Sequence, residues 1–247
     1  MKILLIIPAY NEEKNILNVC KKIEEYIKTN ENNVFDYIVV NDGSSDNTYK
    51  VCIENKLKCL NLISNLGIGG AVQAGYLYAY QNDYDIAIQF DGDDQHDINY
   101  IMNICEPILK EECDICIGSR YLDDGSSEFK STFMRRLGKD IISFMIKIFC
   151  NIKVTDPTSG FRAVNKNVIK LFSVDYPSDY PEPESIVSLI KRGFKISEVP
   201  VSMNERKSGK SSINFIKSIH YMIKVSIAIV IESLKNKKNK EDVSKCQ

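Results

Sequence analysis

The N-terminal half of the chain alternates between short apolar runs and longer helical patterns, and this alternation restricts the fold more than any other feature. Apolar runs typical of strands lie at residues 3–7, 37–40, 60–63, 86–90 and 115–117. Helix-like segments lie between them, near residues 12–29, 46–56, 69–81 and 98–110. The strands are almost continuously apolar, as in a sheet that is covered on both faces. The pattern therefore predicts an α/β fold in which helices flank a mostly parallel sheet.

The C-terminal half is less regular. Residues 131–150 read as a broadly apolar helix, 155–164 as a turn into a short strand, and 175–184 as a loop stiffened by proline. A strand near 194–199 and an amphipathic helix at 213–234 follow, and the polar tail 235–247 is predicted to be disordered. We therefore expect one large domain at residues 1–212, followed by a C-terminal amphipathic helix and a tail.

The composition excludes several classes of protein. The chain has 247 residues, of which 44% are hydrophobic, and its net charge of −1 gives no global basic field for nucleic acid. The eight cysteines lack the paired spacing of a zinc site, so reduced thiols are expected. Lys217, His220 and Lys224 interrupt the best candidate for a membrane span. Reduced thiols and the lack of a recognisable signal peptide favour the cytoplasm.

Polar loops follow the first four predicted strands. They are PAYNEE at 8–13, NDGSSDNT at 41–48, NLGIGG at 65–70 and DGDDQHD at 91–97. Ligands of open α/β sheets bind at the carboxyl ends of the strands, so these loops predict a single site. Asp91 and Asp93, separated by one glycine, offer the oxygen ligands that Mg²⁺ or Mn²⁺ prefers, and an ion held there would carry a diphosphate.

With three later segments, these loops resemble a known family. The matching segments are IIPAYNEE at 6–13, VVNDGSSDNT at 39–48, NLGIGGAVQAGY at 65–76, QFDGDDQHD at 89–97, IGSRY at 117–121, DPTSGFRA at 156–163 and VPVSMNERKSGKSS at 199–212. The chain resembles the inverting family 2 glycosyltransferases, which have the nucleotide-diphospho-sugar transferase (GT-A) fold, a Rossmann-like sheet flanked by helices. The similarity is greatest to the branch of dolichol- and polyprenyl-phosphate sugar transferases.

The resemblance implies a site for a UDP- or GDP-sugar and for a divalent ion, Mg²⁺ or Mn²⁺. The residues implied in nucleotide-sugar binding are Pro8, Ala9, Tyr10, Asn11, Glu12, Asp42, Asn65, Gly69, Asp91, Gly92 and Asp93. Metal ligands are implied at Asp91, Asp93 and Gln95, and Asp93 is expected to be essential for catalysis. Tyr10 would offer its ring to the base, and Asp42 would accept hydrogen bonds from the base edge.

Basic residues match the positions where the family binds the phosphate of an acceptor. They are Arg120, Arg135, Arg136, Arg162, Arg206 and Lys210. A phosphate monoester has a second pKa of about 6, so it arrives as an anion and needs no general base. A sugar hydroxyl does need one. Glu182 and Glu184 are then the candidate bases, and we assign the role to Glu184.

A polyprenyl-phosphate acceptor lies in a bilayer, so the enzyme must reach a membrane surface. The helices expected at 131–150 and 213–234 are candidates for lying in the interface, and packing against a partner subunit is the other interpretation. We expect a peripheral protein on the cytoplasmic face of the membrane, without a spanning segment. A homo-oligomer and a membrane-protein partner are both open.

Alternative functions differ in particular features. The sugar could be transferred to a glycan hydroxyl in cell-surface polysaccharide synthesis. A sugar-1-phosphate nucleotidyltransferase would carry a basic, glycine-rich loop after its first strand, where this chain has PAYNEE. Intact Asp91 and Asp93 argue against a non-catalytic, glycosyltransferase-like subunit. The chain has no tryptophan, so the Q-x-x-R-W element of processive synthases is absent. Asn41 replaces an acid common in relatives, and Asp94 is an additional acid whose role is open.

Overall fold

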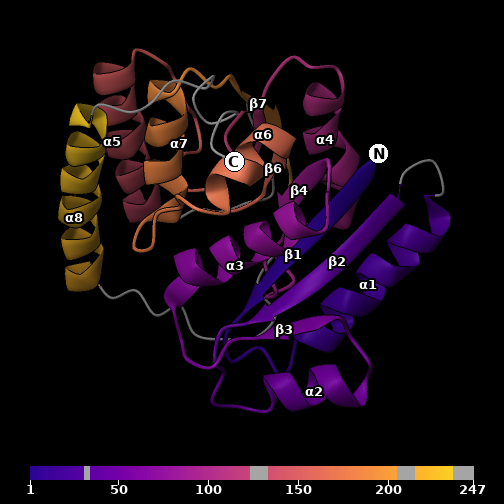
Figure 1. Ribbon diagram of the computed structural model, residues 1–247. Coiled ribbons are helices and arrows are strands. Elements are labelled where there is room, and N and C mark those ends of the chain that lie inside the picture. The colour runs from indigo at the N-terminus through magenta and orange to yellow at the C-terminus, as the bar shows by residue number, and fades with distance from the viewer. Residues whose placement is uncertain (31–33, 123–132, 205–214, 236–247) are drawn as a thin grey trace.

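The computed structural model describes residues 1–30, 34–122, 133–204 and 215–235, and a mixed sheet forms its centre (Figure 1). In this part of the chain the sheet has seven strands in the order β3-β2-β1-β4-β6-β5-β7. The strands are β1 (Lys2–Ala9), β2 (Val34–Asn41), β3 (Cys59–Asn61), β4 (Ile86–Gln89), β5 (Ile115–Ser119), β6 (Arg162–Asn165) and β7 (Ile196–Pro200). All neighbours pair in parallel except β6, which is antiparallel to both β4 and β5. The predicted mostly parallel sheet is confirmed.

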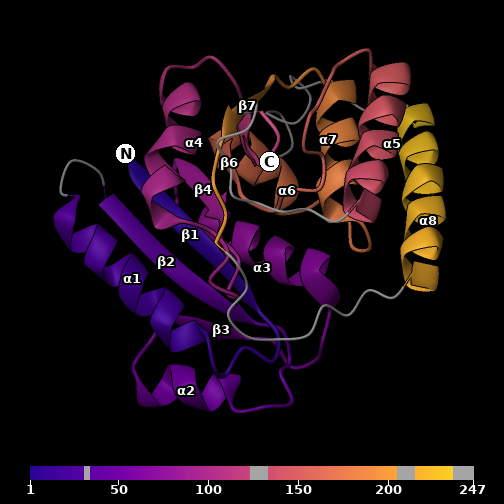
Figure 2. The same cartoon turned by 180° about the vertical axis from the view of Figure 1, so that it is seen from behind.

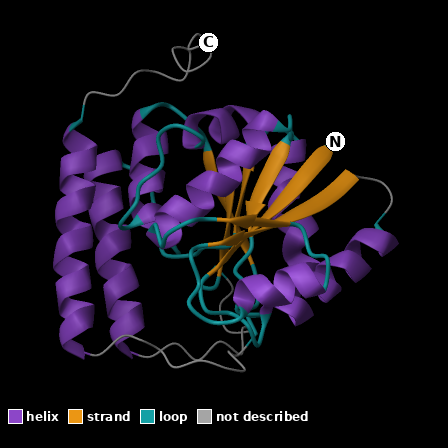
Figure 3. Ribbon diagram, turned by 60° about the horizontal axis from the view of Figure 1, so that its bottom comes forward, coloured by secondary structure: helices purple, strands orange, loops and turns teal. Residues whose placement is uncertain are grey.

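Helices cover both faces of the sheet, as Figure 3 shows. They are α1 (Ile16–Thr29), α2 (Thr48–Glu54), α3 (Gly67–Gln81), the 3₁₀ helix η1 (Ile98–Tyr100), α4 (Ile101–Leu109), α5 (Phe133–Cys150), α6 (Lys166–Phe172), α7 (Pro181–Lys191) and α8 (Phe215–Leu234). Leu4 and Ile6 of β1 are buried in a cluster with α3. Ile3, Leu5 and Ile7 point the other way, into a second cluster with α1 and α4. Apolar residues are therefore needed at every position from Ile3 to Ile7.

Two segments differ from the expected elements. Residues 181–184 begin helix α7 instead of belonging to a loop, and Pro181 stands at the start of the helix, where its missing N–H costs nothing. Residues 166–172 form a short helix, α6, that was not expected. Its N-cap is Asn165, whose Oδ1 accepts the Val168 N–H at 3.1 Å. Seven residues are too few for a helical period to be recognised in the sequence.

The antiparallel strand β6 decides which loops meet at the edge of the sheet. Because β6 runs opposite to β4, its first residue, Arg162, pairs with Gln89, the last residue of β4. The segment before β6 therefore continues beyond the carboxyl end of β4. A Cβ at Gly160 would lie only 3.1 Å from Oδ2 of Asp91. The segment before β6 thus forms one wall of the site at the carboxyl ends of the first strands.

Helices α5, α7 and α8 stand side by side at one end of the molecule (Figures 1 and 2). Helix α8 packs against both α5 and α7. Val225 and Ile229 of α8 and Ile142 and Ile146 of α5 are buried in the same cluster as α7. No helix in the described part of the chain has the length and apolar character that a membrane span requires.

Candidate active site

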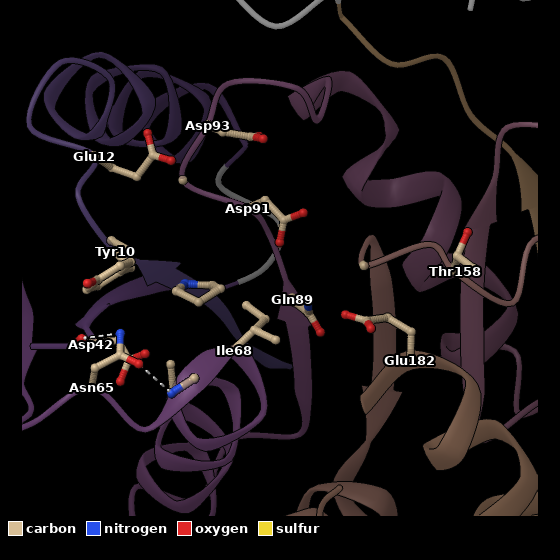
Figure 4. A pocket seen from close by; sticks show the side chains of 16 residues that line it. Tyr10, Glu12, Asp42, Asn65, Ile68, Gln89, Asp91, Asp93, Thr158 and Glu182 are labelled. Atoms are coloured by element: carbon tan, nitrogen blue, oxygen red, sulfur yellow. Dashed lines mark hydrogen bonds between the residues drawn. The ribbon is translucent and has the colours of Figure 1, made fainter. Parts of the chain in front are cut away.

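A pocket of about 520 Å³ opens at the carboxyl ends of β1, β2 and β4, and Figure 4 shows its side chains. This volume lies in the range of small-molecule sites, roughly 300–1,000 Å³. The residues that line it are Pro8, Ala9, Tyr10, Glu12, Asp42, Asn65, Gly67, Ile68, Ala71, Gln89, Asp91, Gly92, Asp93, Thr158, Gly160 and Glu182. The loops after β1, β2, β3 and β4 all contribute, so the structure brings together the loops that the sequence analysis grouped into one site.

One end of the pocket is formed by Tyr10, Asp42 and Asn65. Asp42 is 3% exposed, and its Oδ1 accepts the backbone N–H of Leu66 at 2.7 Å. The Asn65 side chain donates to the backbone carbonyl of Asp42 at 3.1 Å. These bonds hold the Asp42 carboxylate at the pocket wall, while Tyr10 is half exposed beside it. A fixed acceptor beside an accessible aromatic ring is suited to a planar base.

Two residues expected to bind the nucleotide support the pocket from outside it in the described structure. Asn11 has a φ of +58°, and its Oδ1 accepts the backbone N–H groups of Ser45 at 2.9 Å and Asp46 at 3.3 Å. Asn11 therefore ties the loop after β1 to the loop after β2. A Cβ at Gly69 would lie 2.4 Å from the carbonyl oxygen of Pro177, so this glycine permits close packing of α3. Their observed contacts are supporting ones, and contact with the nucleotide stays a prediction for both.

Asp91 and Asp93 both line the pocket at the end of β4. A Cβ at Gly92, between them, would lie 3.1 Å from the Pro8 carbonyl oxygen, so this turn presses against β1. Asp94, the additional acid, is buried with a φ of +65° and pairs with Lys22 of α1 at 2.5 Å. The structure thereby gives Asp94 a role, which is to fasten the acidic turn to α1.

His96 holds Asp91 from behind. Its Nδ1 accepts the backbone N–H of Asp91 at 3.0 Å, and its Nε2 lies 3.4 Å from Oδ2 of the same residue. The imidazole is 3% exposed and stacks on Phe161, with the ring centroids 4.8 Å apart. Burial lowers the pKa of His96 to about 4, so the ring is neutral near pH 7. A neutral ring orients Asp91 without neutralising its charge.

The acidic pair fits a divalent ion. Carboxylate oxygens are hard ligands, and Mg²⁺ is commonly bound by one or two carboxylates together with substrate phosphates. The described residues contain no cluster of three or more His, Cys, Asp or Glu side chains that would hold an ion without such help. Gln95 does not line the pocket in the described structure, and its backbone carbonyl accepts the Asn204 N–H at 2.8 Å. Its role as a metal ligand stays a prediction.

The other end of the pocket is formed by Gln89, Thr158, Gly160 and Glu182. Glu182 lies in the first turn of α7, and Figure 4 shows its carboxylate and the Gln89 side chain pointing toward one another. Burial raises the pKa of the Glu182 carboxyl, and Arg162 partly opposes this effect. Two features of the sequence mark this end of the pocket. Gln89 is polar at the end of an apolar strand, and Thr158 and Gly160 lie in the DPTSGFRA segment.

Glu184, the assigned base, does not line the pocket in the described structure. Burial raises the pKa of its carboxyl, and the next contributions come from Glu232 of α8 and from Asp179. These neighbours place Glu184 on the side of α7 that faces α8. Glu182, two residues earlier, is the glutamate of this helix that lines the pocket. The structure therefore favours Glu182 over Glu184 as the candidate base, and the role itself stays a prediction.

The basic residues predicted to bind the acceptor phosphate differ in burial and in hydrogen-bond partners. Arg162 is fully buried, and its guanidinium donates to Ser159 O, to Glu182 O and to Ser185 Oγ, which is a supporting position beneath the pocket. Arg120 donates to both carboxylate oxygens of Asp156, at 2.6 and 2.8 Å, and to Thr158 Oγ1 at 3.0 Å. Arg120 therefore braces the segment that carries Thr158.

Of the four remaining basic residues, the structure describes the side chain of Arg136 alone. Arg136 is exposed near the start of α5. The side chain of Arg135 and the whole of Arg206 and Lys210 lie outside the described residues. An acceptor phosphate contact by these four residues is therefore a proposal and not an observation.

Comparisons with other proteins agree with this geometry. The family model described as "Glycosyl transferase family 2" matches residues 4–172. The UDP-N-acetylglucosamine–dolichyl-phosphate N-acetylglucosaminyltransferase of Methanococcus voltae is 34% identical over 219 residues, which cover 81% of this chain and 84% of that protein. The undecaprenyl-phosphate mannosyltransferase of Micrococcus luteus is 24% identical over 222 residues, which cover 87% of this chain and 88% of that protein.

A solved structure of similar fold is glucosyl-3-phosphoglycerate synthase from Mycobacterium tuberculosis, in complex with Mn²⁺, UDP and phosphoglyceric acid. It matches with a TM-score of 0.70 at 18% identity, over 94% of this chain and 78% of that one. At this identity the likeness concerns the fold alone. It confirms the GT-A architecture expected from the sequence.

Proposed function

Because the chain belongs to glycosyltransferase family 2, we propose that it transfers a sugar, with inversion, from a UDP- or GDP-sugar to a polyprenyl phosphate. The observation that carries the proposal is one pocket in which Asp42 and Tyr10 lie at one end and Asp91 and Asp93 lie beyond them. A nucleoside and its diphosphate have the same order. Relatives named for transfer to dolichyl and undecaprenyl phosphate support the choice of acceptor.

In this proposal the chain's own residues position the donor. Tyr10 stacks on the base and Asp42 accepts hydrogen bonds from its edge. Asp91 and Asp93 would hold Mg²⁺ or Mn²⁺, which, when bound, neutralises the charge of the departing diphosphate. His96 keeps Asp91 aimed into the pocket. A structural neighbour in complex with Mn²⁺ and UDP supports this ion and this class of nucleotide.

The acceptor would approach as a phosphate anion, which attacks the anomeric carbon without losing a proton. Arginine suits such an acceptor because its planar group binds phosphate through two hydrogen bonds. Arg136 on α5 is the described candidate, together with Arg135, Arg206 and Lys210. The alternative acceptor is a glycan hydroxyl, and Glu182 favours that reading because it is a pocket carboxylate of raised pKa.

The outer faces of α5 and α8 support a membrane-bound acceptor. Both helices expose apolar side chains at helical spacing: Leu137, Ile141, Phe144 and Ile148 on α5, and Ile223, Ile227, Ile231 and Leu234 on α8. The four on α8 are 53–76% exposed. We propose that these faces lie in the membrane interface on its cytoplasmic side, with Lys224 extending to the headgroups. A partner subunit would be the other way to cover them.

The test is transfer to a lipid with and without its phosphate. Purified protein, Mn²⁺ and labelled UDP-glucose, UDP-N-acetylglucosamine or GDP-mannose are incubated with undecaprenyl phosphate or with undecaprenol in detergent. Label should enter the lipid fraction only with the phosphate, and a chelator should abolish the transfer. Transfer to a soluble glycan but not to undecaprenyl phosphate would move the assignment to the hydroxyl acceptor.

A further inference from the structure

We propose that Glu182 and Gln89 form the subsite that binds the hydroxyl groups of the donor's sugar ring, and that this subsite selects a neutral hexose over a uronic acid. The inference rests on the proposed function and adds a determinant of donor specificity to it. It does not depend on which acceptor is used.

The order of groups along the pocket gives the first argument. Base, ribose, diphosphate and sugar follow one another in a nucleotide sugar. Figure 4 shows Asp42 and Asn65 at one side, Asp91 in the middle, and Gln89 and Glu182 beyond it. With the base at Asp42 and the diphosphate at Asp91, the sugar reaches the end formed by Gln89 and Glu182.

Hydrogen-bonding capacity gives the second argument. Gln89 is only 1% exposed, yet its Oε1 has no hydrogen-bond partner among the residues that the structure describes. A buried acceptor without a donor costs free energy unless a ligand supplies the donor. The Glu182 carboxylate faces the same space from the opposite wall. The Gln89 amide N–H groups donate to this carboxylate, so the acceptors left for a ligand are Gln89 Oε1 and the remaining lone pairs of Glu182. The O–H groups of a sugar ring are donors that suit both.

Charge gives the third argument and sets the specificity. The Glu182 carboxylate borders this end of the pocket, beyond the ion proposed at Asp91. Two arginines lie nearby, and both are engaged: Arg162 is fully buried and donates to Ser159 O, Glu182 O and Ser185 Oγ, and Arg120 is paired with Asp156. A carboxylate on the sugar would therefore meet like charge and lack a direct basic partner.

The walls of the subsite are closely packed. A Cβ at Gly160 would lie 3.0 Å from Nε2 of Gln89 and 3.1 Å from Oδ2 of Asp91, so the backbone approaches both side chains closely. Glu182 is held by its place in the first turn of α7, and its carbonyl accepts an N–H of Arg162 at 3.3 Å. A preorganised pair of acceptors binds hydroxyl groups with little loss of side-chain entropy.

The variant that tests the inference is Glu182→Gln, which keeps the shape and removes the charge. Its matched control is Glu184→Gln, in the same helical turn but facing α8. Calorimetry with Mn²⁺ compares UDP and GDP, the nucleotide sugar that the wild type binds best, and the uronate of that nucleotide. In Glu182→Gln we expect about tenfold weaker binding of the neutral sugar and less than about twofold change for the nucleotide alone. Discrimination against the uronate should shrink, and Glu184→Gln should resemble the wild type.

Other results would each overturn a different statement. Equal losses for UDP or GDP and for the nucleotide sugar would place Glu182 at the diphosphate. Unchanged donor binding with a turnover rate that no longer rises with pH would make Glu182 a proton acceptor. If Glu182→Gln proves unstable in thermal melts, Gln89→Leu replaces it and should weaken the nucleotide sugar but not the nucleotide. A wild type that binds none of these compounds would instead refute the proposed function.

Discussion

Single residues in this site divide into those that face the pocket and those that hold them in place. Asp91 and Asp93 face it. His96 and Asp94 hold the turn on which these two residues lie: His96 bonds to Asp91, and Asp94 pairs with Lys22. The supporting residues are as polar as the ligand-binding ones. The number of polar residues in a motif is therefore larger than the number that contacts the ligand. Substitution of a pocket residue should therefore affect binding more than stability.

For Asp93→Asn we expect loss of most metal-dependent transfer, about a hundredfold or more, because a neutral amide is a weak ligand for Mg²⁺ or Mn²⁺. The amide oxygen can still accept the Gln95 N–H that Asp93 Oδ1 accepts at 3.2 Å, so the fold should persist. The measurement is the initial rate of transfer as a function of Mn²⁺ concentration, with thermal unfolding of the same protein.

The control for Asp93→Asn is Asp85→Asn, at the opposite end of β4, where Oδ2 accepts the Lys2 N–H at 2.8 Å. An asparagine there can make the same bond and lies far from the pocket, so the rate should stay near that of the wild type. A wild-type rate in Asp93→Asn would refute the metal assignment.

At the scale of elements, α3 lies so close to β1 that only glycine fits at one point of contact. A Cβ at Gly75 would lie 2.2 Å from Cγ2 of Ile6, which is fully buried. The clash falls on a β-branched side chain in the core, which has little freedom to move. The pocket depends on this contact, because α3 begins at the pocket wall with Gly67 and Ile68.

Gly75→Ala should destabilise the protein by about 1–3 kcal/mol, since overpacking outweighs the gain of about 1 kcal/mol in helix propensity. The control is Gly138→Ala in α5, where the new methyl would meet Sδ of Met222 at 3.0 Å. Methionine is flexible and can move aside. Urea unfolding should therefore show a lower midpoint for Gly75→Ala only, and equal midpoints would contradict the packing argument.

The apolar face of α8 gives a second prediction at this scale. Ile227→Glu should weaken sedimentation with anionic liposomes by about tenfold, because it removes one buried isoleucine from the proposed contact. Ile53→Glu, in α2, changes an equally exposed isoleucine away from α8 and should leave sedimentation unchanged. High salt should release the wild type in part by screening Lys224 and Lys235. Unaltered binding of Ile227→Glu would show that α8 does not contact lipid.

For the whole molecule, ligand binding should appear as a gain in stability. A ligand at about 100 times its Kd stabilises the folded state by about 2.7 kcal/mol. UDP or GDP together with Mn²⁺ should raise the melting temperature. The nucleotide alone or the ion alone should raise it less, because Asp91 and Asp93 repel a diphosphate when no cation lies between them. A chelator should reverse the effect. An equal shift with nucleotide and chelator would indicate that binding does not use the acidic pair.

The sequence was sufficient for the first half of the molecule, and the reason is local. Continuous apolar runs alternating with helices form parallel β-α units, and the carboxyl ends of parallel strands share one edge. The loops holding Tyr10, Asp42, Asn65 and Asp91 therefore had to meet, and they do. The acidic pair was recognisable because carboxylates directly after a buried strand require a partner.

Tertiary structure alone decided the far end of the pocket. The antiparallel insertion of β6 between β4 and β5 brings Gly160 beside Asp91, and no local pattern encodes the direction of a four-residue strand. Glu182 and Glu184 look alike in the sequence, yet two residues of a helix are roughly 200° apart around its axis. Packing of α7 against α8 and α5 sets that rotation, and it turns Glu182 into the pocket and Glu184 toward α8.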